Sequence, residues 1–382
     1  MWMLALLVAC QPGQGVLSGT LSQDSGTRPL DTAADTDTDT DTDVDSTATA
    51  DTATVPTGPA PPCGDGQCTW ALVLEESLPQ GRPRGAIGAA VDASGVVHVV
   101  VHDPSESRLL YLRSNTPDVE AIGDGAGEAE STEISVAVDV DGRVHVATMG
   151  GDGYRLIARE PGGDWNQQPV GPRGDVVTTA AVSRGGDTWV GAGSDLFVWN
   201  GGGYTPKPSA GDPVEALALD LAGTTHALVG TGGPEPIYTR FDGSAWVARV
   251  PIYAGVFQRT RLQIGDDDVG HAVVEVENPP GSDLLYAETS TGGWQVTSLA
   301  VGGSAHASGV ALDASDRPHV SYHDGVGAVF HGWFDGSGWV RSEVGGAGAV
   351  QETIPLVDPL TDQPVVVYYD TSTDTLRIYR GS

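Results

Sequence analysis

Two similar stretches, "AVDASGVVHVVVHDP" (residues 90–104) and "ALDASDRPHVSYHDG" (residues 311–325), decide how this chain is interpreted. Each contains a short apolar run with an alanine, then an aspartate, a tight turn, and a β-branched strand with histidines. Five further copies keep this order: "VAVDVDGRVHVAT" near 136, "AAVSRGGDTWVGA" near 180, "LALDLAGTTHALV" near 217, "LQIGDDDVGHAVV" near 262 and "PLVDPLTDQPVVVYY" near 355. Because the histidines recur with the unit, they indicate a repeat protein, and the histidines of one copy are not by themselves evidence of a functional site.

The period of the repeat predicts the fold. Residues at the aspartate position are separated by 47, 44, 37, 45, 48 and 45 positions: Asp92, Asp139, Ser183, Asp220, Gly265, Asp313 and Asp358. A period of about 45 residues with four strand-like segments per unit is typical of a β-propeller blade. We therefore expect an all-β fold with hardly any helix, and seven blades beginning near 86, 132, 177, 214, 259, 307 and 352.

The two ends of the repeat region predict how the ring closes. In the seventh unit Val365 takes the histidine position, so the tryptophan that follows this position in other units would fall beyond Ser382. The segment "CTWALVLEES" (68–77) resembles the fourth strand "SGWVRSEVGG" (337–346) of the sixth unit. We therefore expect the strand around Trp70 to complete the last blade, which leaves no unpaired edge inside the ring.

The N-terminus resembles the lipobox of bacterial lipoproteins, in which a cysteine becomes the lipidated first residue. The resemblance covers "LVAC" (7–10) and departs from the pattern because no Lys or Arg precedes the apolar run and only nine residues precede the cysteine. It implies a signal peptide over 1–10, lipid on Cys10 and export, and Gln11 implies the outer membrane or cell surface. No other stretch is apolar over 18 residues, so we expect membrane contact through the lipid alone.

Residues 11–62 are rich in Asp, Thr and Pro and have almost no large apolar side chains, which predicts a disordered acidic linker. Its run "DTDTDTDTDVD" could collect Ca²⁺ weakly, but it lacks the turn glycine and closing Glu of an EF-hand loop.

Cys63 and Cys68 then enclose a Gly-Asp-Gly turn. In an exported protein we expect them to form a disulfide, since two thiolates are too few for a structural zinc site. The propeller is expected over 63–382.

The net charge limits the possible partners. The chain has 51 Asp and Glu against 19 Lys and Arg, a formal charge of -32. Nucleic acid is excluded because phosphate contacts need clustered cations. The sequence has no phosphate loop, zinc signature or Ser or Cys nucleophile motif, so we expect no cofactor and no metal. The remaining partners are a glycan or a surface protein, bound by a monomer.

The units over 68–382 resemble the Asp-box (BNR-type) repeats of sialidase-like propellers in bacterial surface proteins, and "VDASGVVHV" (91–99) is also similar to the NHL propeller repeat. The full Asp-box order is missing; "SRGGDTW" (183–189) comes nearest. The sialidase-like resemblance implies a carbohydrate-active enzyme, a glycoside hydrolase or lyase, as the alternative function. Such an enzyme needs an arginine trio, a Tyr-Glu pair and an acidic Asp. The candidates, which the sequence does not combine into a site, are Arg259, Arg261, Tyr368 and Tyr369.

The histidines divide into two groups. Five share one repeat position, which favours a structural hydrogen bond within or between blades: His98, His145, His226, His271 and His319. His319 and His323 cannot share a metal ion, because four residues of a strand span about 13 Å.

The second strands of three units end in a polar pair: His102 and Asp103, His323 and Asp324, Tyr369 and Asp370. Each aspartate could simply cap the following turn. Because the three blades are consecutive in a closed ring, the alternative is a non-catalytic ligand-binding patch on one face. The sequence thus predicts a surface-anchored, non-catalytic binding or interaction module, with the carbohydrate-active enzyme as the alternative.

Overall fold

The computed structural model describes residues 63, 68–78, 87–103, 106, 108–122, 134–150, 153–171, 179–184, 187–230, 235–278, 281–300, 306–324, 327–346, 348 and 350–382. These residues belong to one compact unit, Pro56–Ser382. The predicted signal peptide, Cys10 and the linker 11–62 lie outside the described residues.

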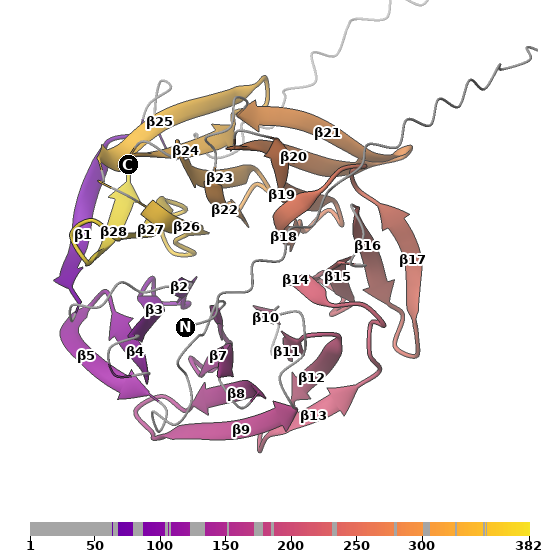
Figure 1. Ribbon diagram of the computed structural model, residues 1–382, viewed down its shortest axis with the longest axis horizontal. Helices are drawn as coiled ribbons and strands as arrows, with labels where there is room; N and C mark the ends of the chain where they lie inside the picture. Colours follow the sequence, from indigo (N-terminus) through magenta and orange to yellow (C-terminus); the bar gives the residue numbers. More distant parts are fainter. Residues whose placement is uncertain are drawn as a thin grey trace, which may run out of the picture. The chain divides into compact units, whose positions relative to one another are not determined.

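The strands form seven antiparallel four-stranded sheets arranged around a common centre (Figure 1). Blade 1 contains β2 (Ile87–Val91), β3 (Val97–Asp103), β4 (Arg108–Arg113) and β5 (Thr116–Ile122). Blade 2 contains β6 (Ile134–Val138), β7 (Val144–Gly150), β8 (Gly153–Arg159) and β9 (Trp165–Gly171). Blade 3 contains β10 (Thr179–Arg184), β11 (Asp187–Ala192), β12 (Asp195–Trp199) and β13 (Tyr204–Lys207). Blades 4 and 5 contain β14 (Val214–Leu219), β15 (Thr225–Gly230), β16 (Pro236–Phe241), β17 (Trp246–Pro251); β18 (Phe257–Ile264), β19 (Gly270–Asn278), β20 (Gly281–Ser290), β21 (Gly293–Ala300). Blades 6 and 7 contain β22 (His306–Leu312), β23 (Pro318–His323), β24 (Ala328–Phe334), β25 (Trp339–Gly346); β26 (Val350–Val357), β27 (Pro364–Asp370), β28 (Thr375–Gly381), β1 (Trp70–Ser77).

The prediction of a seven-bladed, all-β propeller is confirmed. The first strand of each blade begins at residue 87, 134, 179, 214, 257, 306 or 350, within two residues of the predicted positions. The described part of the chain contains no helix, and so none that could cross a membrane. Each blade begins with its innermost strand, and the ring repeats because the sequence repeats.

The ring closes as predicted, with a strand from the N-terminal side completing the last blade. The order in blade 7 is β1-β28-β27-β26, and β1 pairs antiparallel with β28 from Trp70 opposite Gly381 to Ser77 opposite Thr375. The indole Nε1 of Trp70 also donates a hydrogen bond to Ser342 Oγ of blade 6 at 3.1 Å. The added strand therefore completes blade 7 and also binds it to blade 6.

The predicted disulfide is present directly before this strand. Cys63 and Cys68 are bonded, with their Cα atoms 4.6 Å apart. Both are buried against Trp333, which is 1% exposed, in a small cluster that also contacts Trp70. The disulfide therefore fixes the start of β1 against blade 6.

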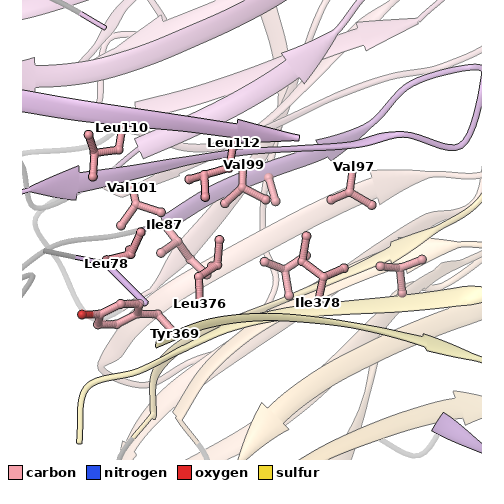
Figure 2. Packing of buried hydrophobic residues seen from close by; sticks show 13 residues of the cluster. Leu78, Ile87, Val97, Val99, Val101, Leu110, Leu112, Tyr369, Leu376 and Ile378 are labelled. Carbon is pink, nitrogen blue, oxygen red and sulfur yellow. The ribbon is translucent and has the colours of Figure 1, made fainter. Parts of the chain in front are cut away.

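The hydrophobic core is a ring of clusters between neighbouring blades. The cluster at the joint of blades 7 and 1 combines side chains of β2, β3 and β4 with those of β27 and β28 (Figure 2). The second strands β3 and β27 are buried at every position, because each is covered on both faces by neighbouring blades. With about 1.5–3 kcal/mol for each fully buried aliphatic side chain, most of the stability lies between blades, so an open ring would be weak.

Deletion of residues 63–77 should therefore destabilise the whole propeller. The deletion removes β1, the disulfide and the Trp70 contact with blade 6, and leaves the outer edge of β28 without a hydrogen-bonded partner strand. We expect the melting temperature, followed by circular dichroism, to fall by more than about 10 °C. Deletion of 15 residues from the linker, 41–55, is the length-matched control and should leave the melting temperature unchanged. An unchanged value for the 63–77 deletion would show that β1 does not close the ring.

Candidate functional site

The repeated histidines form buried hydrogen-bonded units that belong to the scaffold. In blade 1 the imidazole Nε2 of His98 lies 3.1 Å from Asp92 Oδ2, and its Nδ1 lies 2.6 Å from the Tyr111 hydroxyl. The other carboxylate oxygen, Asp92 Oδ1, accepts backbone hydrogen bonds from Ser94 and Val96 at 2.8 and 2.9 Å. The aspartate thus caps the turn after the inner strand and at the same time orients the histidine.

Four other blades contain the same arrangement or a variant of it. The groups are Asp139, His145 and Tyr204; Asp220, His226 and Tyr238; His271 and Tyr286; and Asp313, His319 and His331. Tyr204 lies on β13 of the next blade, so the blade 2 unit also joins two blades. All five repeated histidines are 0–6% exposed. The predicted structural role of this position is confirmed.

The inner strands enclose a polar cavity at the centre of the ring. Its volume is about 150 Å³, and it is lined by residues of β2, β6, β14, β18, β22 and β26. Small residues are required where the inner strands meet: a Cβ on Gly88 would lie 2.7 Å from Val136 Cγ2, and one on Gly309 would lie 2.4 Å from Pro355 Cδ. Four larger polar residues line the same space: Glu215, Arg261, Gln263 and Glu352.

Glu352 is the centre of the polar contacts in this cavity. It is 4% exposed. Its Oε1 lies 3.2 Å from the Nη1 of Arg259 and 3.1 Å from the Nη2 of Arg261, and its Oε2 accepts the backbone N–H of Ile87 at 3.2 Å. One carboxylate therefore links the inner strands of blades 7, 5 and 1. The side chains of Arg259 and Arg261 are 29% and 36% exposed, so the guanidinium groups remain accessible to a ligand.

The three predicted pairs lie at the ends of second strands, beside the starts of inner strands. Asp370 pairs with Val350, the first residue of β26, and Val101 pairs with Ile87, the first residue of β2. The pairs are therefore on the face where the inner strands begin. His102, His323 and Tyr369 are 1%, 6% and 1% exposed. Replacing these side chains with alanine would remove packing as well as a polar group.

The aspartates of these pairs have intramolecular partners. Asp324 Oδ1 accepts the N–H groups of Gly327 and Ala328 at 3.0 Å, as expected for a turn cap. Asp103 pairs with Arg108 at 3.2 Å.

Asp370 combines a turn cap with an ion pair. Burial would raise the pKa of this carboxyl, but hydrogen bonds from Ser372 and from Arg377, 2.9 Å away, outweigh burial and hold it below its usual range. The capping role thus accounts for Asp324 and Asp370. The ligand-binding role of the six residues stays a prediction.

Two of the three pairs lie on blades 7 and 1, which pack against each other through one hydrophobic cluster. The ring of Tyr369 packs beside Leu78 and Leu376, and in Figure 2 its hydroxyl oxygen points away from the cluster. That hydroxyl donates a hydrogen bond to Asp374 Oδ1 at 3.0 Å. Burial raises the pKa of Tyr369, and the negative charges of Asp374 and Asp103 raise it further. Asp103 of blade 1 is thus within electrostatic range of Tyr369 of blade 7.

The candidate residues for a sialidase-like enzyme do not lie together in one site. Arg259 and Arg261 bind the chain's own carboxylate, Glu352. Tyr368 is buried and stacks on Tyr379, with ring centroids 5.8 Å apart. In the part of the chain that the structure describes, neither Tyr368 nor Tyr369 lines the central cavity. The same part contains no group of three or more His, Cys, Asp or Glu residues arranged to hold a metal ion.

Sequence reasoning missed Glu352, although a signal for it exists. Arg259 and Glu352 both lie six residues before the aspartate position of their units, at Gly265 and Asp358. Opposite charges at one repeat position of inner strands, two units apart, indicate a contact across the centre of a ring. The contact can be recognised only once the number of blades is known.

Comparison with known proteins supports the fold. No family model and no curated protein matches the sequence. A streptogramin B lyase structure is similar, with a TM-score of 0.57 and 12% identity over 82% of this chain and 98% of that one. The β-propeller domain of Cps50 (Swd1) from Myceliophteria thermophila has a TM-score of 0.53 and 10% identity over 80% and 99%. A triple arginine-to-alanine mutant of AofleA from Arthrobotrys oligospora has a TM-score of 0.51 and 11% identity over 72% and 90%. The chain is a seven-bladed β-propeller, and at these identities the similarity concerns the fold alone.

Buried histidines should make this propeller sensitive to mild acid. Burial lowers the pKa of His98, His145, His226, His271 and His331, so these rings are neutral in the folded protein near neutral pH. An unfolded histidine has a pKa of about 6.5; below that pH the unfolded chain binds more protons than the folded one. We expect the free energy of unfolding, measured by urea denaturation, to be constant just above pH 6.5 and to fall as the pH drops below it.

Replacement of His145 by Gln removes one titrating ring and should make this fall shallower. The paired carboxylates Asp92 and Asp139 have lowered pKa values, so their contribution to stability is lost only in stronger acid, below about pH 4. They do not obscure the histidine range. A free energy of unfolding that stays constant between about pH 6.5 and 4.5 would contradict the prediction.

Proposed function

We propose that this protein is a non-catalytic binding or interaction module that takes its ligand at the central cavity. The observation that carries the proposal is the arrangement around Glu352. This buried carboxylate lines the central cavity together with Arg261, and it also pairs with the half-exposed guanidinium of Arg259. Polar groups fixed in a concave site of this kind give a binding site its orientation and specificity.

The charges of the cavity favour a neutral, polar ligand. The lining contains Arg261, Glu215 and Glu352, and Arg259 pairs with Glu352 from beside it, so two positive and two negative charges lie at the cavity. These groups offer hydrogen-bond donors and acceptors without a net charge, while the overall charge of -32 disfavours polyanions. A hydroxyl-rich glycan or a polar loop of a surface protein fits this description.

The size of the cavity limits what can enter it. Its volume of about 150 Å³ is below the roughly 300–1,000 Å³ of typical small-molecule pockets. Only the tip of a larger ligand would enter, and the rest would lie on the face where the inner strands begin. The pairs His102 and Asp103, His323 and Asp324, and Tyr369 and Asp370 are the proposed second contact region on that face.

The proposal includes the cellular location of the protein. The lipobox-like "LVAC" and the following acidic segment support a lipid-anchored protein of the outer membrane or cell surface, whose linker holds the propeller away from the membrane. A propeller of the Asp-box or NHL type would suit such a location. The ring and its disulfide are compatible with export.

A glycan array combined with a panel of fluorogenic glycosides tests the binding function. We expect binding without turnover, and Arg261→Ala should weaken it by about tenfold, as expected for loss of a charged hydrogen bond. Arg249→Ala is the matched control, because this arginine pairs with Asp212 at the outer strand of blade 4. Turnover of any glycoside would instead support the carbohydrate-active enzyme. Binding that is equal in the Arg261 variant and the wild type would remove the cavity from the proposal.

The anchor is tested separately by Cys10→Ser. The variant has no thiol to accept lipid, so it should move from the membrane fraction to the soluble fraction when cells are fractionated. Cys63→Ser, which cannot affect lipidation at Cys10, is the control and should stay with the membranes if the protein folds. Membrane association of Cys10→Ser equal to that of the wild type would exclude lipid anchoring at this residue.

A further inference from the structure

A second cavity lies between blades 5 and 6, away from the centre of the ring. Its volume is about 240 Å³. The lining residues are Leu299 of β21, Val320 and Tyr322 of β23, Gly332 of β24, and Trp339, Val340 and Arg341 of β25. None of these residues lines the central cavity. Arg341 is exposed and Trp339 is half-exposed, so the cavity is accessible from the outer side of the ring.

The cavity exists because one repeat position lacks a side chain in blade 6. In each blade the residue after the repeat-histidine position pairs with a third-strand residue, and in blade 6 this pair is Val320 and Gly332. The third-strand residues at the same position in the other six blades are Leu112, Ile157, Phe197, Thr239, Ala287 and Tyr379. Leu112, Ile157 and Phe197 pack in clusters with the preceding blade. Gly332 leaves that space open.

The backbone does not require glycine at this position. Gly332 has no positive φ, and a Cβ there would lie 3.6 Å from Val340 O and 3.7 Å from Trp339 Cε3, which are ordinary contact distances. Gly88 and Gly309, by contrast, have no room for a Cβ. A glycine inside a strand is less favourable than alanine, because it loses more conformational freedom on folding. Neither the backbone conformation nor crowding therefore explains glycine at this position.

The lining combines aromatic walls with one available cation. Tyr322 and Phe330 stack with ring centroids 5.5 Å apart, and the guanidinium carbon of Arg341 lies 4.6 Å from the centroid of Phe330. With the described residues Arg341 forms no ion pair, although the chain has 51 acidic residues. The face of the Phe330 ring orients the guanidinium of Arg341. The N–H donors of this guanidinium remain available for an anion.

We propose that this cavity is a binding site for a small aromatic carboxylate. The ring enters beside Tyr322 and Trp339 in the space left by Gly332, and the carboxylate binds the guanidinium of Arg341. Cavities of about 150 Å³ hold a benzene molecule, so 240 Å³ accommodates one ring and its substituent. A sugar would place several hydroxyl groups against the side chains of Leu299, Val320 and Trp339, which offer them no acceptor. This proposal does not rest on the central site.

The test compares benzoate with its neutral analogue benzyl alcohol and with methyl glycosides, by calorimetry on the full chain. We expect saturable binding of benzoate in the millimolar range or tighter, and binding of the neutral compounds at least about tenfold weaker. Arg341→Gln should weaken benzoate binding by about tenfold. Arg240→Gln, which changes an exposed arginine of β16 in blade 4, is the matched control and should bind benzoate as the wild type does.

The decisive variant is Gly332→Leu, which places the side chain of Leu112 at the equivalent position of blade 6. It should abolish benzoate binding and keep or raise the melting temperature, because it fills an internal space. If this variant does not fold, Gly332→Ala, whose added methyl group meets only ordinary contacts, should fold and weaken binding. Absence of saturable benzoate binding, equal binding of benzyl alcohol or a glycoside, or binding unchanged in both Gly332 variants would each overturn the proposal.

Discussion

Five of the seven blades have a carboxylate that caps the turn after the inner strand: Asp92, Asp139, Asp220, Asp313 and Asp358. Asp92 holds that turn with one oxygen and orients His98 with the other, and His98 in turn binds the hydroxyl of Tyr111. The Tyr111 ring then receives the edge of Trp165 from blade 2, with centroids 5.0 Å apart. A single repeat position thus connects the inner turn of one blade with the outer strand of the next. This contact between the third-strand tyrosine of one blade and the outer-strand tryptophan of the next holds neighbouring blades together in the ring.

The same series of contacts explains how the ring closes. In blade 6, His331 takes the place of the tyrosine and lies 2.9 Å from His319. From blade 7, Trp70 of β1 contacts His331, with ring centroids 5.2 Å apart. Trp70 therefore occupies the position that Trp165 has in blade 2, although it lies at the other end of the repeat region. The closing strand replaces the missing repeat tryptophan as well as the missing backbone partner of β28.

The sequence predicts the fold well because the contacts that define a blade are local and repeated. The turn cap, the histidine and the outer tryptophan recur with a period of about 45 residues, so seven blades and their starts follow from spacing. The contact between Glu352 and Arg259 is different, because it joins blades 7 and 5 across the centre of the ring. Its partners are 93 residues apart by their numbers, and only the ring geometry brings them together. The burial of His102, His323 and Tyr369 likewise depends on the neighbouring blades, which no single unit reveals.

In a repeat protein, departures from the repeat carry more information about function than the repeated residues do. The histidine of the repeat first suggests a site, yet it is a structural residue because five blades share it. Glu352 and Arg261 are not required to build a blade, since other inner strands form without them. Gly332 is similar, because six blades carry a side chain at that position. A departure that costs stability and is not required by the backbone needs another reason to persist, and the reason we propose at both cavities is ligand binding.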